Sequence, residues 1–420
     1  MRTKYFSPTA RILSLLLVAA LVLTGIGFSL QLPVSACTPE DCGGWMETSA
    51  GMATVIGDVG RIVQKANPAE GEKLDYRQTP TADYFNQQAA GRLTPDEWMD
   101  FRALQEFMNP PAVMFDGYNP PARLWKYGLA FTAYGLANIP YIEPGQRVRV
   151  GHYIDKLIQK MKQKAVWVDW IEQGFGNDYL SKHNIMYKGH LNLMYGLYGL
   201  TYGGNKWDKD FTWLTDKISK EIDETPYSGV TCEPDDYFVQ CNTIGIYSLL
   251  IYDKLHGTDH SKQVNNWLKF VKTRLIIQPY GLLSARYHPE HDYVDDMVSG
   301  YGNAWSITFL HAIDPAFAEE LYPKFKQTFV KDAGTMAYAT EYPNGNLDGQ
   351  ASVITLALAK EMGDQALFDK ILNLVEKYNT PSFNGPTVTY KGIDKNGQGF
   401  ILFSKVNVGL GKLLAGKPLD

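Results

Sequence analysis

The chain has 420 residues, of which 45% are hydrophobic and 20% are charged, so we expect an ordinary globular protein with a large core. The formal net charge is -5 at pH 7, and no basic stretch follows the first residues. Nucleic acids and anionic membrane surfaces are therefore excluded as expected partners, because proteins bind both through clustered positive charge.

The first 36 residues have the pattern of an export signal. Three basic residues precede an apolar run over 12–30, which ends at the small-residue sequence Pro-Val-Ser-Ala36. Three outcomes stay open: cleavage after Ala36, lipidation at Cys37, or retention of the run as an N-terminal membrane anchor. Because the positive charge precedes the run, we expect an exported protein in which everything after residue 40 lies outside the cytoplasm.

Residues 37–80 are rich in Gly, Ala, Thr and Pro without a periodic pattern, so we expect a linker before a folded domain over 81–420. That domain begins with Thr94-Pro-Asp-Glu97, which supplies an N-cap, a proline at the first helical position and a capping-box glutamate. Apolar residues at helical spacing then predict about twelve helices. They span 94–108, 120–138, 146–164, 184–201, 206–223, 240–256, 258–275, 299–312, 315–330, 350–362, 364–377 and 402–414.

The predicted helices come in pairs, in which a nearly uncharged, Gly- and aromatic-rich helix precedes an amphipathic one. The turns between partners recur at Gly203, Gly257, Asp314 and Gly363, which are 54, 57 and 49 residues apart. Such a repeat indicates stacked helical hairpins. Six hairpins whose first helices carry few charges predict an all-α (α/α)6 barrel, because those helices must be covered on their flanks and back. An open superhelix is the alternative, and short β structure is expected near 280–287 and 387–390.

The stretch 232–241, Cys-Glu-Pro-Asp-Asp-Tyr-Phe-Val-Gln-Cys, places two thiols, three carboxylates and two aromatic rings in ten residues. Pro234 predicts a loop that leads into a helix beginning near Cys241. A thiol in the first turn of a helix is favoured as the thiolate, so one interpretation is an acid–base site. The other is a disulfide between Cys232 and Cys241, as is common in exported proteins. The spacing leaves both open.

His190 lies near the start of a predicted inner helix, at the same end of the barrel as the 232–241 loop. A histidine on an apolar helix is often a satisfied core residue, but this placement makes it a candidate for proton handling. The pair Asp235-Asp236 is similar to the acidic cluster that holds magnesium and a diphosphate in terpene cyclases. Val239 stands where such a cluster needs a third acid, so we predict no metal site there.

Two other groups of polar residues can be explained by a functional or by a purely structural role. His288 and His291 are metal-ligand residue types, but Pro289 breaks helical presentation between them, which favours a solvated loop. Asp169 and Glu172 are candidates for the paired carboxylates of a glycosidase, with capping and hydrogen bonding as the alternative role.

Several segments resemble the linalool dehydratase/isomerase family: 184–200, 232–242, 301–305, 314–317 with 323–329, and 361–365. The resemblance extends from about Tyr84 to the C-terminus and is strongest over 165–330. It implies an (α/α)6 barrel, a periplasmic homopentamer with active sites at the subunit contacts, and no cofactor. It also implies two reactions of small apolar alcohols and alkenes: dehydration of the tertiary allylic alcohol linalool to myrcene, and isomerisation between linalool and geraniol.

By position, the resemblance assigns a catalytic imidazole, two reduced thiols and two active-site tyrosines to His190, Cys232, Cys241, Tyr127 and Tyr301. The resulting hypothesis is that a Tyr or Asp group protonates the hydroxyl and that one thiol takes a proton from carbon. His190 would set the protonation of the thiols. This hypothesis requires the two sulfurs to be unbonded and close to His190.

Met186, Phe238 and Trp305 are then expected to line the substrate pocket. The family also uses an Asp and a Tyr from an N-terminal loop of the neighbouring subunit, and Asp116 and Tyr118 are the candidates for those roles. The region around them is shorter here and does not align with the family. A carbohydrate-active barrel and a non-catalytic carrier of apolar ligands are the alternative functions.

Overall fold

The computed structural model describes residues 84–86, 91–108, 125–379, 381–384, 387–390, 393 and 395–416, all within one compact unit, Ser49–Asp420. The predicted export signal and the linker over 37–80 lie outside the described residues. So do Asp116 and Tyr118.

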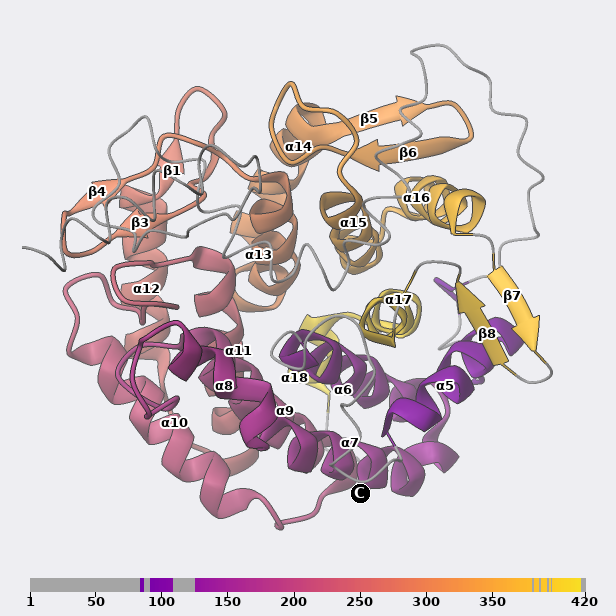
Figure 1. Cartoon of the computed structure of the whole chain (residues 1–420), viewed down its shortest axis with the longest axis horizontal. Helices are drawn as coiled ribbons and strands as arrows, with labels where there is room; N and C mark the ends of the chain where they lie inside the picture. The colour runs from indigo at the N-terminus through magenta and orange to yellow at the C-terminus, as the bar shows by residue number, and fades with distance from the viewer. Residues whose placement is uncertain are drawn as a thin grey trace, which may run out of the picture. The chain divides into compact units, whose positions relative to one another are not determined.

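Six helices form a closed inner ring (Figure 1). Each packs against the next along the chain, and the last returns to the first. The inner helices are α6 (Trp125–Ile142), α9 (Ile185–Tyr202), α11 (Val239–His256), α13 (Gly300–Ile313), α15 (Gly349–Glu361) and α17 (Lys395–Val406). Nearly every residue of α9 and α13 is buried, which explains why these helices carry so few charges.

An outer helix packs beside each inner one and buries only one face. The outer helices are α5 (Pro95–Met108), α7 (Arg147–Met161), α10 (Asp208–Asp223), α12 (Ser261–Arg274), α14 (Pro315–Phe329) and α16 (Gln365–Tyr378). The described part of the chain is therefore the predicted all-α (α/α)6 barrel, and the open superhelix is ruled out because α17 contacts α6.

The residues predicted at the turns between partner helices lie at helix ends. Gly203, Gly257 and Gly363 adopt φ values of 74°, 67° and 70°, the left-handed conformation in which a residue other than glycine is strained. Asp314 accepts a hydrogen bond from the Phe317 N–H, which makes it the N-cap of α14. The recurring spacing in the sequence therefore reports real hairpin turns.

Three helical features differ from the prediction. The short helix α8 (Lys164–Glu172) and the 3-10 turn η3 (Pro144–Gln146) lack a strong apolar period and were not expected. The last predicted helix is two, α17 and α18 (Leu410–Ala415), because Gly409 adopts a φ of 106° between them. Within the described helices, none is long and apolar enough to cross a bilayer.

Four antiparallel hairpins are attached to the helices. Their strands are β1 (Ile276–Ile277), β2 (Leu282–Leu283), β3 (Tyr287–His288), β4 (Tyr293–Val294), β5 (Val330–Ala333), β6 (Met336–Ala339), β7 (Pro381–Asn384) and β8 (Thr387–Tyr390). The β structure expected near 280–287 and 387–390 is confirmed. The β5–β6 hairpin was not predicted, and the loop after it approaches the start of α13.

A buried ion cluster joins α5 to α17 where the ring closes. Lys405 is fully buried, and its Nζ donates to Asp96 at 2.5 Å, to Asp100 at 2.7 Å and to the Tyr390 hydroxyl at 2.9 Å. Two carboxylates in an apolar interior are tolerated only when a cation is paired with them.

We expect Lys405→Met to lower the free energy of unfolding by about 3–5 kcal/mol, because it leaves the buried Asp100 and the half-buried Asp96 without their cation. Urea denaturation measures the loss. Lys220→Met is the matched control, since Lys220 pairs with Glu224 at 3.7 Å on an exposed surface and such pairs contribute less than about 1 kcal/mol. Equal losses in the two variants would contradict the stabilising role of the cluster.

Candidate functional site

The inner helices bring together residues from the first two turns of three helices. Tyr127 comes from α6, His190 from α9, and Tyr301 and Trp305 from α13. The ring centroid of His190 lies 5.8 Å from that of Tyr127 and 5.6 Å from that of Trp305. The ring centroids of Tyr301 and Trp305 are 5.7 Å apart. These four residues, predicted from segments far apart in the sequence, therefore form one aromatic cluster.

His190 is held by a tyrosine that the sequence analysis missed. The Tyr134 hydroxyl lies 2.5 Å from His190 Nδ1, and both side chains are buried. Tyr127, Phe131 and Tyr134 follow one another at i, i+4 and i+7 on α6, and Phe131 also contacts the His190 ring at 5.9 Å. That helical spacing is the signal that would have identified Tyr134.

The imidazole of His190 is neutral. Burial, with a smaller contribution from the Lys126 charge, lowers the pKa of His190 to about 3. Burial raises the pKa of Tyr134 well above its usual range, so its hydroxyl stays protonated. The pair is therefore a neutral phenol bonded to a neutral imidazole.

The direction of this bond follows from the partners available. A buried hydroxyl needs an acceptor for its proton, and His190 Nδ1 is the acceptor that the described residues offer Tyr134. We therefore assign the Tyr134 O–H as donor to Nδ1, which leaves the proton of the neutral imidazole on Nε2.

Two buried N–H donors of this cluster have no acceptor among the described residues. They are His190 Nε2 and Trp305 Nε1, on side chains with 1% and 0% exposure. A buried donor without an acceptor costs free energy, so such groups often mark a place where another molecule binds. An oxygen atom with free lone pairs would satisfy both kinds of donor.

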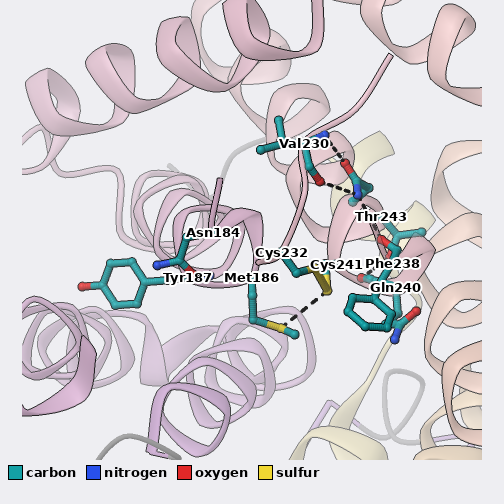
Figure 2. The surroundings of a disulfide bond; sticks show 10 residues. Asn184, Met186, Tyr187, Val230, Cys232, Phe238, Gln240, Cys241 and Thr243 are labelled. Atoms are coloured by element: carbon teal, nitrogen blue, oxygen red, sulfur yellow. Dashed lines mark hydrogen bonds between the residues drawn. A yellow bond between two sulfur atoms is a disulfide. The ribbon is translucent and has the colours of Figure 1, made fainter. Parts of the chain in front are cut away.

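The two cysteines are joined in a disulfide (Figure 2). The Cα atoms of Cys232 and Cys241 are 6.7 Å apart, because the loop folds back on itself: the Cys232 N–H donates to the Asp236 carbonyl at 2.7 Å. Asp235 adopts a φ of 62° at the turn. The prediction of two reduced thiols is therefore wrong for this structure, and the disulfide interpretation of the spacing is the correct one.

The disulfide lies beside one of the predicted pocket residues. The Cys241 sulfur is 3.7 Å from the Met186 sulfur, and Figure 2 shows Met186 pointing at the bridge, with Phe238 nearby. Phe238 is 5% exposed and is the N-cap residue of α11. In the bonded form neither sulfur has a proton to give or a lone pair basic enough to take one.

Comparison with known proteins identifies the family of this chain. Residues 126–396, well over half of the chain, match the family model described as linalool dehydratase/isomerase. The chain belongs to the linalool dehydratase/isomerase family. The matched range contains every predicted site residue except Asp116 and Tyr118.

Solved structures of similar topology include mannanases. The GH76A α-1,6-mannanase of Salegentibacter sp. HEL1_6 is 11% identical with a TM-score of 0.47, over 79% of this chain and 100% of that one. An inactive variant of the same enzyme in complex with α-1,6-mannotetrose matches with the same identity and TM-score, over 77% and 99%. Similarity at this level carries no functional argument.

The residues considered for a metal site and for a glycosidase pair have other surroundings in this structure. Asp236 pairs with Arg286 at 3.2 Å and Asp235 with His291 at 2.8 Å, so both carboxylates hold the loop to the segment 286–291. Glu172 is exposed at the last residue of α8, and the side chain of Asp169 lies outside the described residues. The glycosidase pair therefore gains no support.

We expect Tyr134→Phe to move part of the His190 proton from Nε2 to Nδ1, because Nδ1 loses its donor. Nitrogen NMR of the imidazole measures the tautomer. The same variant should lose about 1–3 kcal/mol of stability for the unpaired ring nitrogen. Tyr247→Phe is the control: it removes an equally buried hydroxyl, bonded to the Leu410 carbonyl at 2.9 Å, and should leave the tautomer unchanged. An unaltered tautomer in Tyr134→Phe would contradict the assigned bond direction.

Proposed function

We propose that this protein is a cofactor-independent lyase that removes water from small tertiary allylic alcohols. The reaction is of the linalool dehydratase type, linalool to myrcene, with isomerisation between linalool and geraniol as the related second reaction. Family membership supports an enzyme of this kind. The choice of alkenol and the balance of the two reactions belong to the proposal.

The observation that carries the proposal is the pair of unsatisfied donors at His190 Nε2 and Trp305 Nε1. Their rings are 5.6 Å apart and are otherwise surrounded by aromatic side chains such as Phe131, whose ring is 5.1 Å from that of Trp305. A molecule that suits this environment has one oxygen to accept hydrogen bonds and a hydrocarbon body. A small alkenol has this composition, whereas a sugar would bring many hydroxyls to an apolar wall.

The chemistry fits a dry interior. The hydroxyl of a tertiary allylic alcohol leaves as water once it is protonated, and positive charge then develops on carbon. Water must be excluded so that it does not capture that charge at random. A neutral imidazole N–H and an indole N–H can hold the oxygen without themselves being ionised, and the surrounding aromatic faces tolerate developing positive charge.

The family roles of Cys232 and Cys241 are open only to a reduced form of the protein. We propose that reduction frees a thiol beside Met186, and that its thiolate form accepts the proton from the carbon next to the departing hydroxyl. The bonded form would then be inactive. Tyr127 and Tyr301 belong to the same cluster and are proposed to face the substrate.

Assembly and location are also proposals. We propose an exported homo-oligomer, a pentamer by analogy with the family, in which the neighbouring subunit completes the site. Asp116 and Tyr118 are the residues proposed to be supplied across that contact.

We expect Trp305→Phe to lower kcat/KM for linalool by about tenfold, because one donor to the hydroxyl oxygen is lost. Inhibition by myrcene should be unchanged, since a hydrocarbon accepts no hydrogen bond. Gas chromatography of linalool, myrcene and geraniol in the reduced protein measures both. Binding of linalool without any turnover would instead indicate a carrier, and equal effects on linalool and myrcene would contradict the role of the indole N–H.

A reductant should switch turnover on. We expect alkenol turnover to rise at least tenfold when the Cys232–Cys241 bond is reduced, with thiol titration counting two new thiols per chain. Cys232→Ala has no disulfide, so its turnover should be independent of reductant. If the wild-type protein turns over equally with and without reductant, the sulfurs take no part in proton transfer and the bridge is structural.

A further inference from the structure

The start of α13 is contacted by a carboxylate that neither the motifs nor the family pattern identified. Glu341 lies in the loop between β6 and α15. One of its carboxylate oxygens accepts the Ser299 hydroxyl at 2.5 Å, and the other accepts the Tyr301 backbone N–H at 2.9 Å. The next turn of the same helix carries Trp305, one of the two unsatisfied donors.

The backbone holds this loop in place as well. The Gly300 N–H donates to the Glu341 carbonyl at 2.8 Å. A Cβ atom at residue 300 would lie 2.0 Å from the Thr340 carbonyl oxygen, so only glycine allows the loop to come this close to the helix. The position of the Glu341 carboxyl group is therefore set by three hydrogen bonds and one close backbone approach.

Glu341 is protonated at neutral pH. Burial, reinforced by the negative charge of Asp348, raises its pKa to about 8, although the hydrogen bonds from Ser299 and Tyr301 oppose the shift. The described groups that interact with it electrostatically are Asp348 at the N-cap of α15, Tyr301 on α13 and the adjacent Tyr342. As a whole residue Glu341 is half-buried.

Among the described residues of the cluster, neither Tyr301 nor His190 is a proton donor that works near neutral pH. Burial raises the pKa of Tyr301 well above its usual range, and the pKa of His190 is too low for the imidazolium to be present. A general acid is most effective when its pKa lies near the working pH. Carboxylic acids with raised pKa values are found at active sites for this reason.

We propose that Glu341 is the acid of the site and donates its proton to the hydroxyl of the alkenol substrate. This inference rests on the proposed dehydratase function. The carboxyl O–H bond breaks as the proton moves to the substrate oxygen, and the carbon–oxygen bond then breaks with both electrons leaving on water. The adjacent C–H bond supplies the electrons of the new double bond. Its proton is taken up by the freed thiolate and then returns to the Glu341 carboxylate, which restores both groups.

The same contacts explain how the acid can give its proton up. Once ionised, the Glu341 carboxylate accepts the Ser299 O–H and the Tyr301 N–H at the positive end of the α13 dipole. These contacts stabilise the anion that forms during the reaction. Burial and Asp348 keep the group protonated before it. This combination suits an acid that must be protonated before the reaction and must release its proton during it.

The test combines infrared titration of the protein with the pH profile of turnover in the reduced protein. The protonated carboxyl group of Glu341 should give a carbonyl stretching band that disappears with a midpoint near pH 8. Because Glu341 acts in its acid form, the alkaline limb of the kcat profile should fall as the pH rises through that value, and the acidic limb belongs to the thiolate base. In Glu341→Gln the band and the alkaline limb should both be absent, and kcat should fall by about a hundredfold or more.

Asp348→Asn is the matched variant, because asparagine also caps a helix but carries no charge. Its infrared midpoint and its alkaline limb should both move to lower pH, since the charge that raises the pKa of Glu341 is removed. A purely structural role for Glu341 would not move these two readouts together.

The outcomes separate the two proposals. If the band titrates near pH 8 but no alkenol is turned over at any pH, the dehydratase function fails and Glu341 is still a protonated buried acid. If the band is missing in the wild-type protein, or the alkaline limb survives in Glu341→Gln, the assignment of Glu341 as the acid is overturned whether or not alkenols react.

Discussion

The hydrogen bond between Tyr134 and His190 is the contact on which the interior of this barrel depends. It joins two inner helices, and both side chains are buried. An imidazole buried without a partner for Nδ1 would carry two unsatisfied nitrogens, and the cost would favour its withdrawal from the core. With Nδ1 satisfied, the ring stays neutral and its remaining polar atom is free to meet another molecule. The aromatic cluster around it then provides an apolar surface with few hydrogen-bonding groups.

The architecture explains why these groups meet. In a closed ring of six inner helices, residues from the first turns of different helices lie near one another although they are far apart in the chain. Tyr127, His190 and Trp305 come from three of the six hairpins. The loops at the same end add what the helices lack. The 232–241 loop brings the disulfide against Met186, and the loop after β6 brings Glu341 to the start of α13. A repetitive scaffold is thus combined with loops that differ from one hairpin to the next, which is how one barrel supports different chemistries.

The electrostatic pattern of the site is one of neutral groups held in place. His190 has a lowered pKa and Glu341 a raised one, and burial is the largest cause of both shifts. Each shift removes charge from an interior that solvates charge poorly. Charge is paired at Lys405, which contacts Asp96 and Asp100 where α5 meets α17. An uncharged interior is the environment in which a carbocation-like intermediate is least exposed to capture by water.

The sequence by itself determined the barrel and most of its helix limits. Nearly uncharged helices alternate with amphipathic ones because the inner helices are buried on all sides and the outer helices on one face only. The spacing of apolar residues and the residues at the turns are both local properties of the chain. It also singled out His190, Trp305 and the two cysteines by their motifs. Only the tertiary structure decided that the two sulfurs are bonded, because a separation of nine residues is compatible with either state until the fold of the loop is known. The roles of Tyr134 and Glu341 were likewise decided by the tertiary structure. A pKa and a hydrogen-bond partner depend on which atoms surround a group in space, and neither is encoded in its neighbours along the chain.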